Sequence, residues 1–506
     1  MFAIALYDRE TESLYLCRDR IGKKPLYYAY KDGEIIFGSE LKPILLFPGF
    51  DARVRKEIIP RFLVTQYINA PDTALQDVYK LEPGSILVYK HGEIQTSKYW
   101  DLVERYHTMM ADPVLKYSDA KEGLKDRLRE SVRLRLISDV PLGSFLSGGF
   151  DSSLITAIAQ EISGEPVKTF SIGFKEDKWN EAPYALAISK HLGTDHREYY
   201  IDEDEMLKQV RSIPKYFDEP FADPSEIPTM LVSALARTKV TVALSGDGGD
   251  EFFCGYNIYE HVRKARLLDP LGGVAHTVLA KGPGRMLRLE DKVPIKVRSV
   301  SRNRDTESKT QFANSNYKDY AIRLMADGDY LPCDYMFESR YGVADWQIRR
   351  MLLDMETYLP GDILCKVDRA SMKYSLEARC PILDKDVMEY SFRIPHRFKY
   401  HHGDKKHILK DIAYDYIPRE LLDRPKQGFG VPLDKWLRGP LKSPLKDYSN
   451  RDYISRQGIF DPDNTYEMIR GYLETGDSGP ATGSNYSKIC WSFFQFQEWY
   501  HTYIEK

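Results

Sequence analysis

The hydrophobic pattern between residues 140 and 250 alternates short apolar runs with longer segments of helical spacing. Residues 140–146, 168–174 and 241–244 are short and apolar, which predicts buried strands. Residues 154–162 and 181–192 instead carry apolar side chains at helical spacing. Strand and helix therefore alternate, which predicts an α/β fold with a parallel sheet and crossover helices. Beyond about residue 265 the pattern becomes mainly helical.

A first glycine turn follows the strand predicted at 140–146. It reads SGGFDSS, residues 147–153, and it opens the helical segment. Backbone N–H groups and the positive end of a helix favour an anion at such a turn, and the hydroxyls of Ser147, Ser152 and Ser153 add donors. Asp151 would repel a phosphate unless a divalent cation lay between them, which indicates Mg²⁺ bound with a nucleotide. A serine-capped helix after a tight turn is the alternative explanation.

A second glycine turn follows the strand predicted at 241–244. It reads SGDGGDE, residues 245–251, and its glycines allow the backbone to approach a ligand closely. Asp247, Asp250 and Glu251 offer hard oxygen ligands or a base. The alternatives are a solvated acidic turn or a calcium loop, but the ligand spacing of a calcium loop is absent. In an open parallel sheet both turns would lie at the carboxyl edge, where ligands bind.

These motifs resemble a known family. SGGFDSS resembles the SGGxDSS signature of the PP-loop ATP pyrophosphatases, which cleave ATP between its α and β phosphates to adenylate a substrate. Residues 245–256 (SGDGGDEFFCGY), 366–384 (KVDRASMKYSLEARCPILD) and 424–432 (RPKQGFGVP) resemble the synthetase domain of asparagine synthetases. RDRIGKKPLYY and FGSELKPIL, near the start, resemble the trailing part of that family's glutaminase domain. The resemblance implies a partial, β-rich Ntn-type glutaminase domain at 1–105 and a PP-loop synthetase domain with a helical C-terminal part at 118–506.

The resemblance also implies a role for individual residues. Asp151 and Asp250 would position magnesium pyrophosphate, and Asp247 would be needed to form the acyl-adenylate. Lys426 would stabilise charge on the α-phosphate as pyrophosphate departs. The positions expected to bind ATP are Leu146, Ser147, Gly148, Gly149, Asp151, Ser152, Ser153, Ile172, Ser245 and Gly246.

A charged set stands out among apolar residues in the segment 366–384. It consists of Lys366, Asp368, Arg369, Glu377 and Arg379. One interpretation is an ion-pair network that ties a helix to the core. The other is a clamp for the carboxylate and amine of the substrate, because arginine forks bind carboxylates in a bidentate manner. The sequence leaves both interpretations open.

The expected activity is that of an ATP-dependent, AMP-forming amide ligase. In its simplest form the enzyme would convert aspartate to β-aspartyl-AMP, which ammonia attacks to give asparagine, AMP and pyrophosphate. One alternative is a relative that amidates another carboxylate, such as a sugar uronic acid. A second alternative is a non-catalytic assembly subunit. The expected cofactors are ATP and Mg²⁺.

The glutaminase-like front differs from the family in one respect. The family's glutaminase begins with a cysteine nucleophile, whereas Met1 is followed here by Phe2. Strand patterns at 2–7, 14–17, 35–38 and 85–89 would belong to a sandwich without its opening strands, and such a sheet exposes unpaired edges. We therefore expect a misplaced start, a fragment or a separately encoded glutaminase half. The nitrogen would come from free ammonia or from another chain, and a homodimer is possible.

The composition is that of a globular enzyme. The 506 residues are 42% hydrophobic, which is enough for two domain cores. Lys and Arg total 72 against 75 for Asp and Glu, so no charge excess favours nucleic acid or membrane partners. The six cysteines form no CxxC pair, and the chain has no signal peptide pattern. These features predict a cytoplasmic protein.

Overall fold

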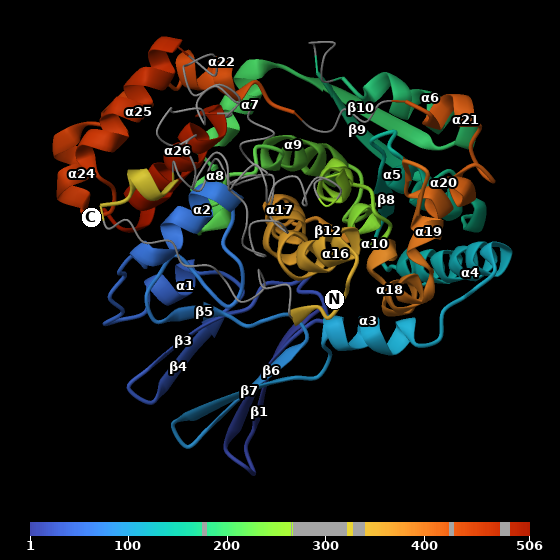
Figure 1. Cartoon of the computed structure of the whole chain (residues 1–506), viewed down its shortest axis with the longest axis horizontal. Coiled ribbons are helices and arrows are strands. Elements are labelled where there is room, and N and C mark those ends of the chain that lie inside the picture. Colours follow the sequence, from blue (N-terminus) through green and yellow to red (C-terminus); the bar gives the residue numbers. More distant parts are fainter. Residues whose placement is uncertain are drawn as a thin grey trace, which may run out of the picture.

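A parallel five-stranded sheet forms the centre of the larger half of the protein (Figure 1). The computed structural model describes residues 1–174, 180–264, 266, 321–326, 340–424, 430–475 and 486–505. The strand order is β10-β9-β8-β11-β12, and every neighbouring pair is parallel. The strands are β8 (Leu142–Phe145), β9 (Lys168–Phe174), β10 (Asp195–Ile201), β11 (Val242–Leu244) and β12 (Glu377–Arg379). The three strands expected from the sequence are β8, β9 and β11, so the predicted parallel α/β sheet is confirmed.

Helices cover both faces of this sheet. One face is covered by α5 (Phe150–Ile162) and α6 (Ala182–Leu192), with α4 (Tyr117–Leu136) packed on α5. The other face is covered by α9 (Glu226–Arg237) and α17 (Leu364–Met372), which pack on each other. The two faces belong to different hydrophobic cores. Phe170 and Ile172 of β9 lie in the core of α9, whereas Leu146 lies in the core of α5. The sheet is thus buried on both sides, as its continuous apolar strands require.

Mainly helical structure makes up the rest of this half, as the sequence pattern predicts. The remaining elements before residue 373 are α3 (Leu102–Met110), α7 (Glu203–Val210), α8 (Ile213–Phe217), α10 (Gly249–Phe252), α16 (Trp346–Glu356) and the π-helical turn η7 (Leu359–Ile363). Those after it are η8 (Pro381–Leu383), α18 (Lys385–Arg393), α19 (His396–Lys399), the hairpin of β13 (Tyr400–His401) and β14 (Asp404–Lys405), α20 (His407–Ala413), α21 (Arg419–Leu422), α22 (Leu433–Arg438), α23 (Lys442–Tyr448), α24 (Arg451–Gln457), α25 (Pro462–Thr475) and α26 (Tyr486–Tyr503).

The first hundred residues form two antiparallel sheets. One has the order β1-β2-β6-β7 and the other β4-β3-β5. The elements are β1 (Ala3–Asp8), β2 (Ser13–Arg18), β3 (Tyr27–Lys31), β4 (Glu34–Gly38), α1 (Lys42–Leu45), η1 (Lys56–Ile58), α2 (Ile59–Thr65), β5 (Val78–Lys80), β6 (Ser85–Lys90) and β7 (Glu93–Lys98). Strand β1 is an edge strand that exposes Ile4, Leu6 and Tyr7. The β-rich character expected of this region is confirmed.

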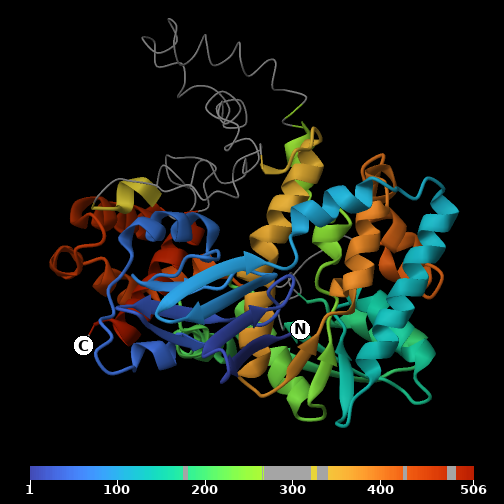
Figure 2. The ribbon, with the colours of Figure 1, turned by 90° about the horizontal axis from the view of Figure 1, so that it is seen from below.

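The two halves share a hydrophobic core. Helix α2 of the first half packs on α26 at the other end of the chain, and Phe62 and Trp499 belong to the same buried cluster. The indole N–H of Trp499 also donates a 3.0 Å hydrogen bond to the carbonyl of Asp218. The aromatic C-terminal segment is therefore a docked helix. Figure 2 shows the blue N-terminal strands on one side of the gold helices α16 and α17 and the parallel sheet on the other. Among the described residues, no helix is both long and apolar enough to cross a bilayer.

Candidate active site

The two glycine loops start side by side because they follow neighbouring strands. Strands β8 and β11 pair in parallel, with Leu244 opposite Ser144. Residues 147–153 and 245–251 therefore leave the same edge of the sheet at the same level. This is the convergence that the strand pattern predicts for the carboxyl edge of a parallel sheet.

The first loop is an internally hydrogen-bonded turn that leads into α5. Gly148 has φ +74°, a left-handed conformation that favours glycine, and Gly149 is the N-cap of the helix. The Ser147 and Ser152 hydroxyl oxygens lie 2.9 Å apart, and the Gly149 N–H donates to Ser147 Oγ at 3.3 Å. The Ser153 hydroxyl is buried. The loop thus presents hydroxyls and a helix N-terminus together, which suits an anion.

The second loop holds Asp247 by short polar contacts. The Ser245 hydroxyl donates to Asp247 Oδ2 at 2.5 Å, and the Ser245 N–H donates to the Arg379 carbonyl at 2.8 Å. Burial raises the pKa of Asp247, while the Ser245 hydrogen bond and the nearby Lys366 ammonium act against that rise. Gly248 has φ +99° and a Cβ there would overlap Leu383, so this turn requires glycine.

The two loops touch each other through their glycines. A Cβ on Gly246 would lie 2.7 Å from the Ser152 nitrogen, and a Cβ on Gly249 would overlap the Asp151 carboxylate. The absence of side chains at these two positions is therefore what lets the acidic residue of the first loop reach the second. The loops form one contiguous site rather than two separate turns.

Lys406 completes this site, although the sequence analysis did not identify it. Its ammonium contacts Asp151 Oδ2 and lies 2.8 Å from Asp250 Oδ1. Burial opposes the charge of Lys406, but its two carboxylate partners raise its pKa above the ordinary value. Lys406 has φ +55° and precedes α20 in the segment HHGDKKH. Its pattern is that of an ordinary polar turn, so only the fold reveals its position.

The residues at this point fit a magnesium-bound nucleotide. Asp151 and Asp250 are the predicted metal ligands, and both reach the same cationic group. Within the described residues no group of three or more His, Cys, Asp or Glu could hold a metal ion. Mg²⁺ is often held by only one or two carboxylates together with substrate phosphates and water, so two carboxylates are sufficient. The Lys406 ammonium between them marks a place where a cation is stabilised.

Other residues predicted to bind ATP surround the first loop. Leu146 and Ile172 are buried in neighbouring strands and loops, with relative exposures of 1% and 2%. Arg424 supports the loop from outside, since its guanidinium donates to the Ser147 carbonyl at 3.2 Å and pairs with Glu181. Lys426, the predicted catalytic lysine, lies outside the described residues.

The structure does not bring the charged set of 366–384 together. Lys366 pairs with Asp223 at 2.6 Å, and Asp368 pairs with Lys24 of the first half at 2.7 Å. Arg369 lies 3.3 Å from Asp218. The remaining two residues pair with each other, as Arg379 Nε donates to Glu377 at 2.7 Å and its Nη1 to two backbone carbonyls at the end of α4. These contacts match the ion-pair interpretation and separate the five residues into different pairs.

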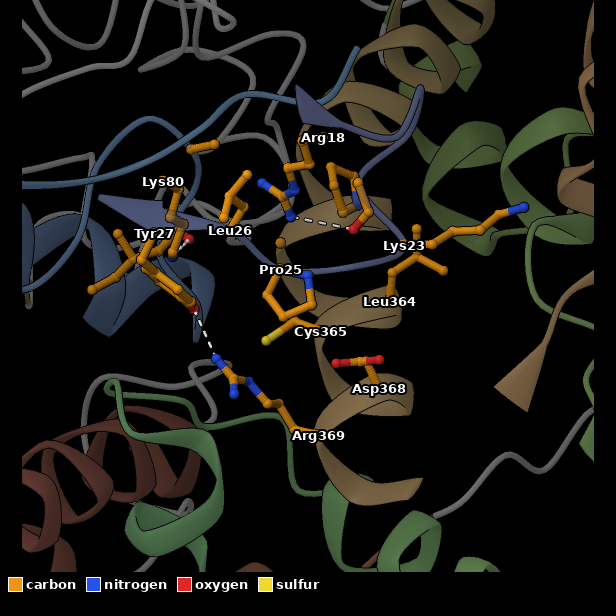
Figure 3. Close-up of a pocket in the computed structure, with 15 residues that line it drawn as sticks. Arg18, Lys23, Pro25, Leu26, Tyr27, Lys80, Leu364, Cys365, Asp368 and Arg369 are labelled. Atoms are coloured by element: carbon orange, nitrogen blue, oxygen red, sulfur yellow. Dashed lines mark hydrogen bonds between the residues drawn. The ribbon is translucent and has the colours of Figure 1, made fainter. Parts of the chain in front are cut away.

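Asp368 and Arg369 line a small cavity where the two halves meet (Figure 3). The cavity has a volume of about 30 Å³, and it lies between the segment 22–27 and helix α17. In Figure 3 the Arg369 guanidinium points to the Tyr27 hydroxyl, which it reaches at 3.3 Å. Glu377 and Arg379 instead line an open groove of about 850 Å³ near the end of α4. The residues that line these two spaces do not include any from the two glycine loops.

Comparison with known proteins agrees with this fold and site. Residues 123–501 match the family model described as asparagine synthase, and residues 1–100 match the one described as a glutamine amidotransferase domain. The fold and these matches define an enzyme of the carbon–nitrogen ligase type. The chain belongs to the asparagine synthetase family.

Curated relatives cover the chain along its whole length. Glutamine-hydrolysing asparagine synthetase 1 of Bacillus subtilis is 30% identical over all of this chain and 78% of its own length. A putative glutamine-hydrolysing asparagine synthetase of Mycobacterium tuberculosis is 30% identical over all of this chain and 77% of its own length. Amidase chry2 of Gibberella zeae is 27% identical over 93% of this chain and 75% of its own length. The chain is thus similar both to asparagine synthetases and to proteins named amidases.

Proposed function

We propose that this enzyme activates a carboxylate as an acyl-adenylate with Mg-ATP and transfers it to ammonia. A carboxylate oxygen attacks the α-phosphorus of ATP, the bond to the bridging β-phosphate oxygen breaks, and pyrophosphate leaves. Ammonia then attacks the acyl carbon, loses a proton, and AMP departs with the electron pair of the cleaved anhydride bond. The products are the amide, AMP and pyrophosphate. The acceptor that family membership favours is aspartate.

The meeting of Asp151, Asp250 and Lys406 carries this proposal. An adenylating site must hold a carboxylate and a triphosphate close together, and it must then stabilise the departing pyrophosphate. Two glycine loops with hydroxyl and N–H donors provide anion sites, while the two carboxylates provide metal ligands. Bound Mg²⁺ would supply charge neutralisation for the phosphate oxygens from the position of these carboxylates.

Lys406 has a specific role in this proposal. Its ammonium pairs with both Asp151 and Asp250. If these two carboxylates held Mg²⁺ with a nucleotide, the ammonium would be placed to contact a phosphate oxygen in the same site. A fixed ammonium there favours the leaving of pyrophosphate because negative charge grows on it as the bond breaks. Asp247, held by Ser245, would act at the acyl-adenylate step, and Lys426 would act at the α-phosphate.

We also propose that the chain is divided into a glutaminase-type domain at 1–105 and a synthetase domain at 118–506. The two family matches, 1–100 and 123–501, support this division. The helix α3 between the matched regions packs on α18, and Arg105 pairs with Glu389 at 3.0 Å. The connection is therefore anchored to the synthetase domain.

A second candidate is an enzyme of the same chemistry with another acceptor, such as a sugar uronic acid. The similarity to proteins named amidases supports it, because they align with 92% and 93% of this chain. The acceptor is the only difference between the two candidates. Both require the same nucleotide site.

The deciding experiment supplies Mg-ATP, an ammonium salt and one carboxylate at a time to the purified full chain. Formation of AMP and pyrophosphate is measured, and the amide is identified by mass spectrometry. Aspartate-dependent AMP with asparagine as product would support the first candidate, and AMP formed only with another acid would select the second. ATP cleavage to ADP and phosphate, or no cleavage with any acid, would contradict the acyl-adenylate mechanism.

A further inference from the structure

Glu226 is a buried carboxylate without a hydrogen-bond partner. It is the first residue of α9, its relative exposure is 0%, and neither carboxylate oxygen has a hydrogen-bond partner within the described part of the chain. A buried polar group left in this state destabilises the folded protein. An alanine or serine at this position would avoid that cost. A group retained at such a cost is a candidate for binding something that the free protein lacks.

A second buried acid faces the same region from another element. Asp362 lies in the π-helical turn η7 with a relative exposure of 3%, and its Oδ1 has no hydrogen-bond partner among the described residues. The nearby Asp223 carboxylate raises the pKa of Asp362 further. Asp223 in turn accepts from Lys366 Nζ at 2.6 Å and from the Ser225 N–H at 2.9 Å. π-Helical turns are frequent at functional sites.

The ammonium of Lys366 favours the charged forms of three carboxylates in this cluster, those of Asp223, Glu226 and Asp362. Lys366 favours the charged form of Glu226, whereas Asp223 and Asp362 both add negative charge to its surroundings. Burial, followed by Asp223 and Asp362, raises the pKa of Glu226 well above its usual value. Burial likewise raises the pKa of Asp362, with Asp223 as the next cause. Lys366 instead holds the pKa of Asp223 at about 2, against the effect of burial. Burial and the neighbouring acids therefore both disfavour the ionised forms of Glu226 and Asp362.

The cluster lies next to the second glycine loop. The ammonium of Lys366, which donates to Asp223 at 2.6 Å and to the Ser225 hydroxyl at 2.8 Å, also favours the charged form of Asp247 in this loop. Helix α17, which carries Lys366, packs tightly on α9, which begins at Glu226. A ligand bound at Glu226 would thus lie one residue along the chain from Ser225, the contact of Lys366.

We propose that Glu226 and Asp362 bind a primary ammonium group of a substrate. Two substrates of the proposed reaction carry this chemistry: an amino-acid acceptor through its α-ammonium group, and the ammonium ion from which the attacking ammonia derives. An ammonium group offers three donors to the free carboxylate oxygens, and its charge balances the excess of acids. The identity of the ligand rests on the proposed function, whereas binding of the ammonium group itself does not.

The test compares ligand pairs that differ by the ammonium group. L-Aspartate is compared with succinate, which lacks the amine, and ammonium chloride with sodium chloride, by titration calorimetry on the full chain. The variants are Glu226→Gln and Asp362→Asn, which keep the shape and remove the acid. Asp204→Asn, an exposed residue of the neighbouring helix α7, is the matched control. Circular dichroism and thermal unfolding establish that each variant is folded.

We expect the wild type to prefer aspartate over succinate, or ammonium over sodium. Glu226→Gln should weaken the preferred ligand by roughly 10- to 100-fold, the usual cost of losing a hydrogen bond to a charged group. Loss of the aspartate preference would identify the acceptor's amine as the ligand, and loss of the ammonium preference the ammonium ion. Wild type without either preference, or a folded Glu226→Gln variant with unchanged affinities, would overturn the proposal. If the wild type showed one of these ligand preferences but formed no AMP, the proposed reaction would be contradicted and the ammonium-binding site would stand.

Discussion

Asp151 and Asp250, which follow different strands of the sheet, contact a single ammonium group, that of Lys406. The first lies at the start of α5 and the second in the short helix α10. Parallel pairing of β8 and β11 places both helix starts at one edge, and glycine at 246 and 249 removes the atoms that would keep them apart. Sheet topology and small residues thus act together to bring the two carboxylates to one ammonium group.

The carboxylate of Asp151 should be essential for AMP formation. Asp151→Asn keeps the side-chain volume but removes the charge that would hold Mg²⁺ with the phosphates. We expect the rate of AMP formation to fall about a hundredfold or more, in the range seen when one transition-state electrostatic contact is removed. The measurement is acceptor-dependent release of pyrophosphate at saturating ATP. Asp386→Asn, an acid in the first turn of α18 away from the two loops, should leave that rate unchanged. A fully active Asp151→Asn enzyme would remove this residue from the metal site.

Loss of Lys406 should lower stability and make it depend more strongly on added Mg²⁺. Lys406→Met leaves Asp151 and Asp250 partly buried without their cation, and breaking such a pair costs about 3–5 kcal/mol. The free energy of unfolding in urea should therefore fall. Because Mg²⁺ can replace the missing charge, added MgCl₂ should restore more stability to the variant than to the wild type. Equal effects of MgCl₂ on both proteins would contradict a shared cation site.

The contact between the two loops should be sensitive to a single methyl group. Gly249→Ala places a Cβ against the Asp151 carboxylate, so the loops must separate. We expect a loss of about 1–3 kcal/mol in stability, typical of overpacking, and a larger loss of AMP formation. Gly471→Ala is the matched control. Nothing lies within 4 Å of a Cβ at Gly471, which is inside helix α25, and alanine there should stabilise the protein by up to about 1 kcal/mol. Retained activity in Gly249→Ala would show that the loops need not touch.

Arg379 should contribute to stability rather than to acceptor binding. Its guanidinium pairs with Glu377 and donates to the carbonyls of Arg135 and Ile137 at 2.9 and 2.8 Å. Arg379→Gln should lower the free energy of unfolding by about 1 kcal/mol, because two partly exposed carbonyls and Glu377 lose a charged donor. The KM for the acceptor should change less than twofold. The exposed Arg133→Gln, which breaks only a surface pair with Glu130, should change neither quantity. A large increase in KM would restore Arg379 to the substrate clamp.

Sequence patterns predicted the parts of the site that are encoded by neighbouring residues along the chain. The strand that precedes each glycine loop is visible as a short apolar run, and parallel strands necessarily end at the same edge. Strands β10 and β12 were not predicted. The segment of β10 is largely polar, and β12 has only three residues, so neither shows an apolar run. The position of Lys406 depends on packing of α20 against α5, and no local pattern encodes it.

Helix geometry explains why neighbouring charges of this set have different partners. Successive residues of a helix point about 100° apart, so Asp368 and Arg369 of α17 face different partners. Asp368 meets Lys24, and Arg369 meets Asp218. The sequence shows these charges as neighbours, whereas their environment is set by which element packs on each side of the helix. The sequence therefore predicts that these residues form ion pairs, but it does not predict with which residues they pair.

Lys399 should make stability depend on alkaline pH. This residue is buried at the end of α19, with its ammonium 5.7 Å from the centre of the Phe253 ring, and burial lowers its pKa to about 7. In the unfolded chain the ordinary value of 10.5 applies, so between these values the unfolded state binds more protons. The free energy of unfolding should therefore rise with pH from about 7 to about 10, by at most ~1.4 kcal/mol per pH unit. Below about pH 7 this residue adds no slope, because both states are protonated.

Lys399→Met isolates this effect, because methionine fills similar space without a charge. The variant should be more stable than the wild type at pH 7, where the native protein must keep a partly charged amine in an apolar environment. That advantage should shrink as pH rises, since the wild type then buries a neutral amine. Urea unfolding across this pH range measures the difference, and the exposed Lys446→Met of α23 provides the control with an unchanged slope. If the free energy of unfolding changed with pH in the same way for Lys399→Met and the wild type, the Lys399 ammonium would keep its ordinary pKa in the folded protein.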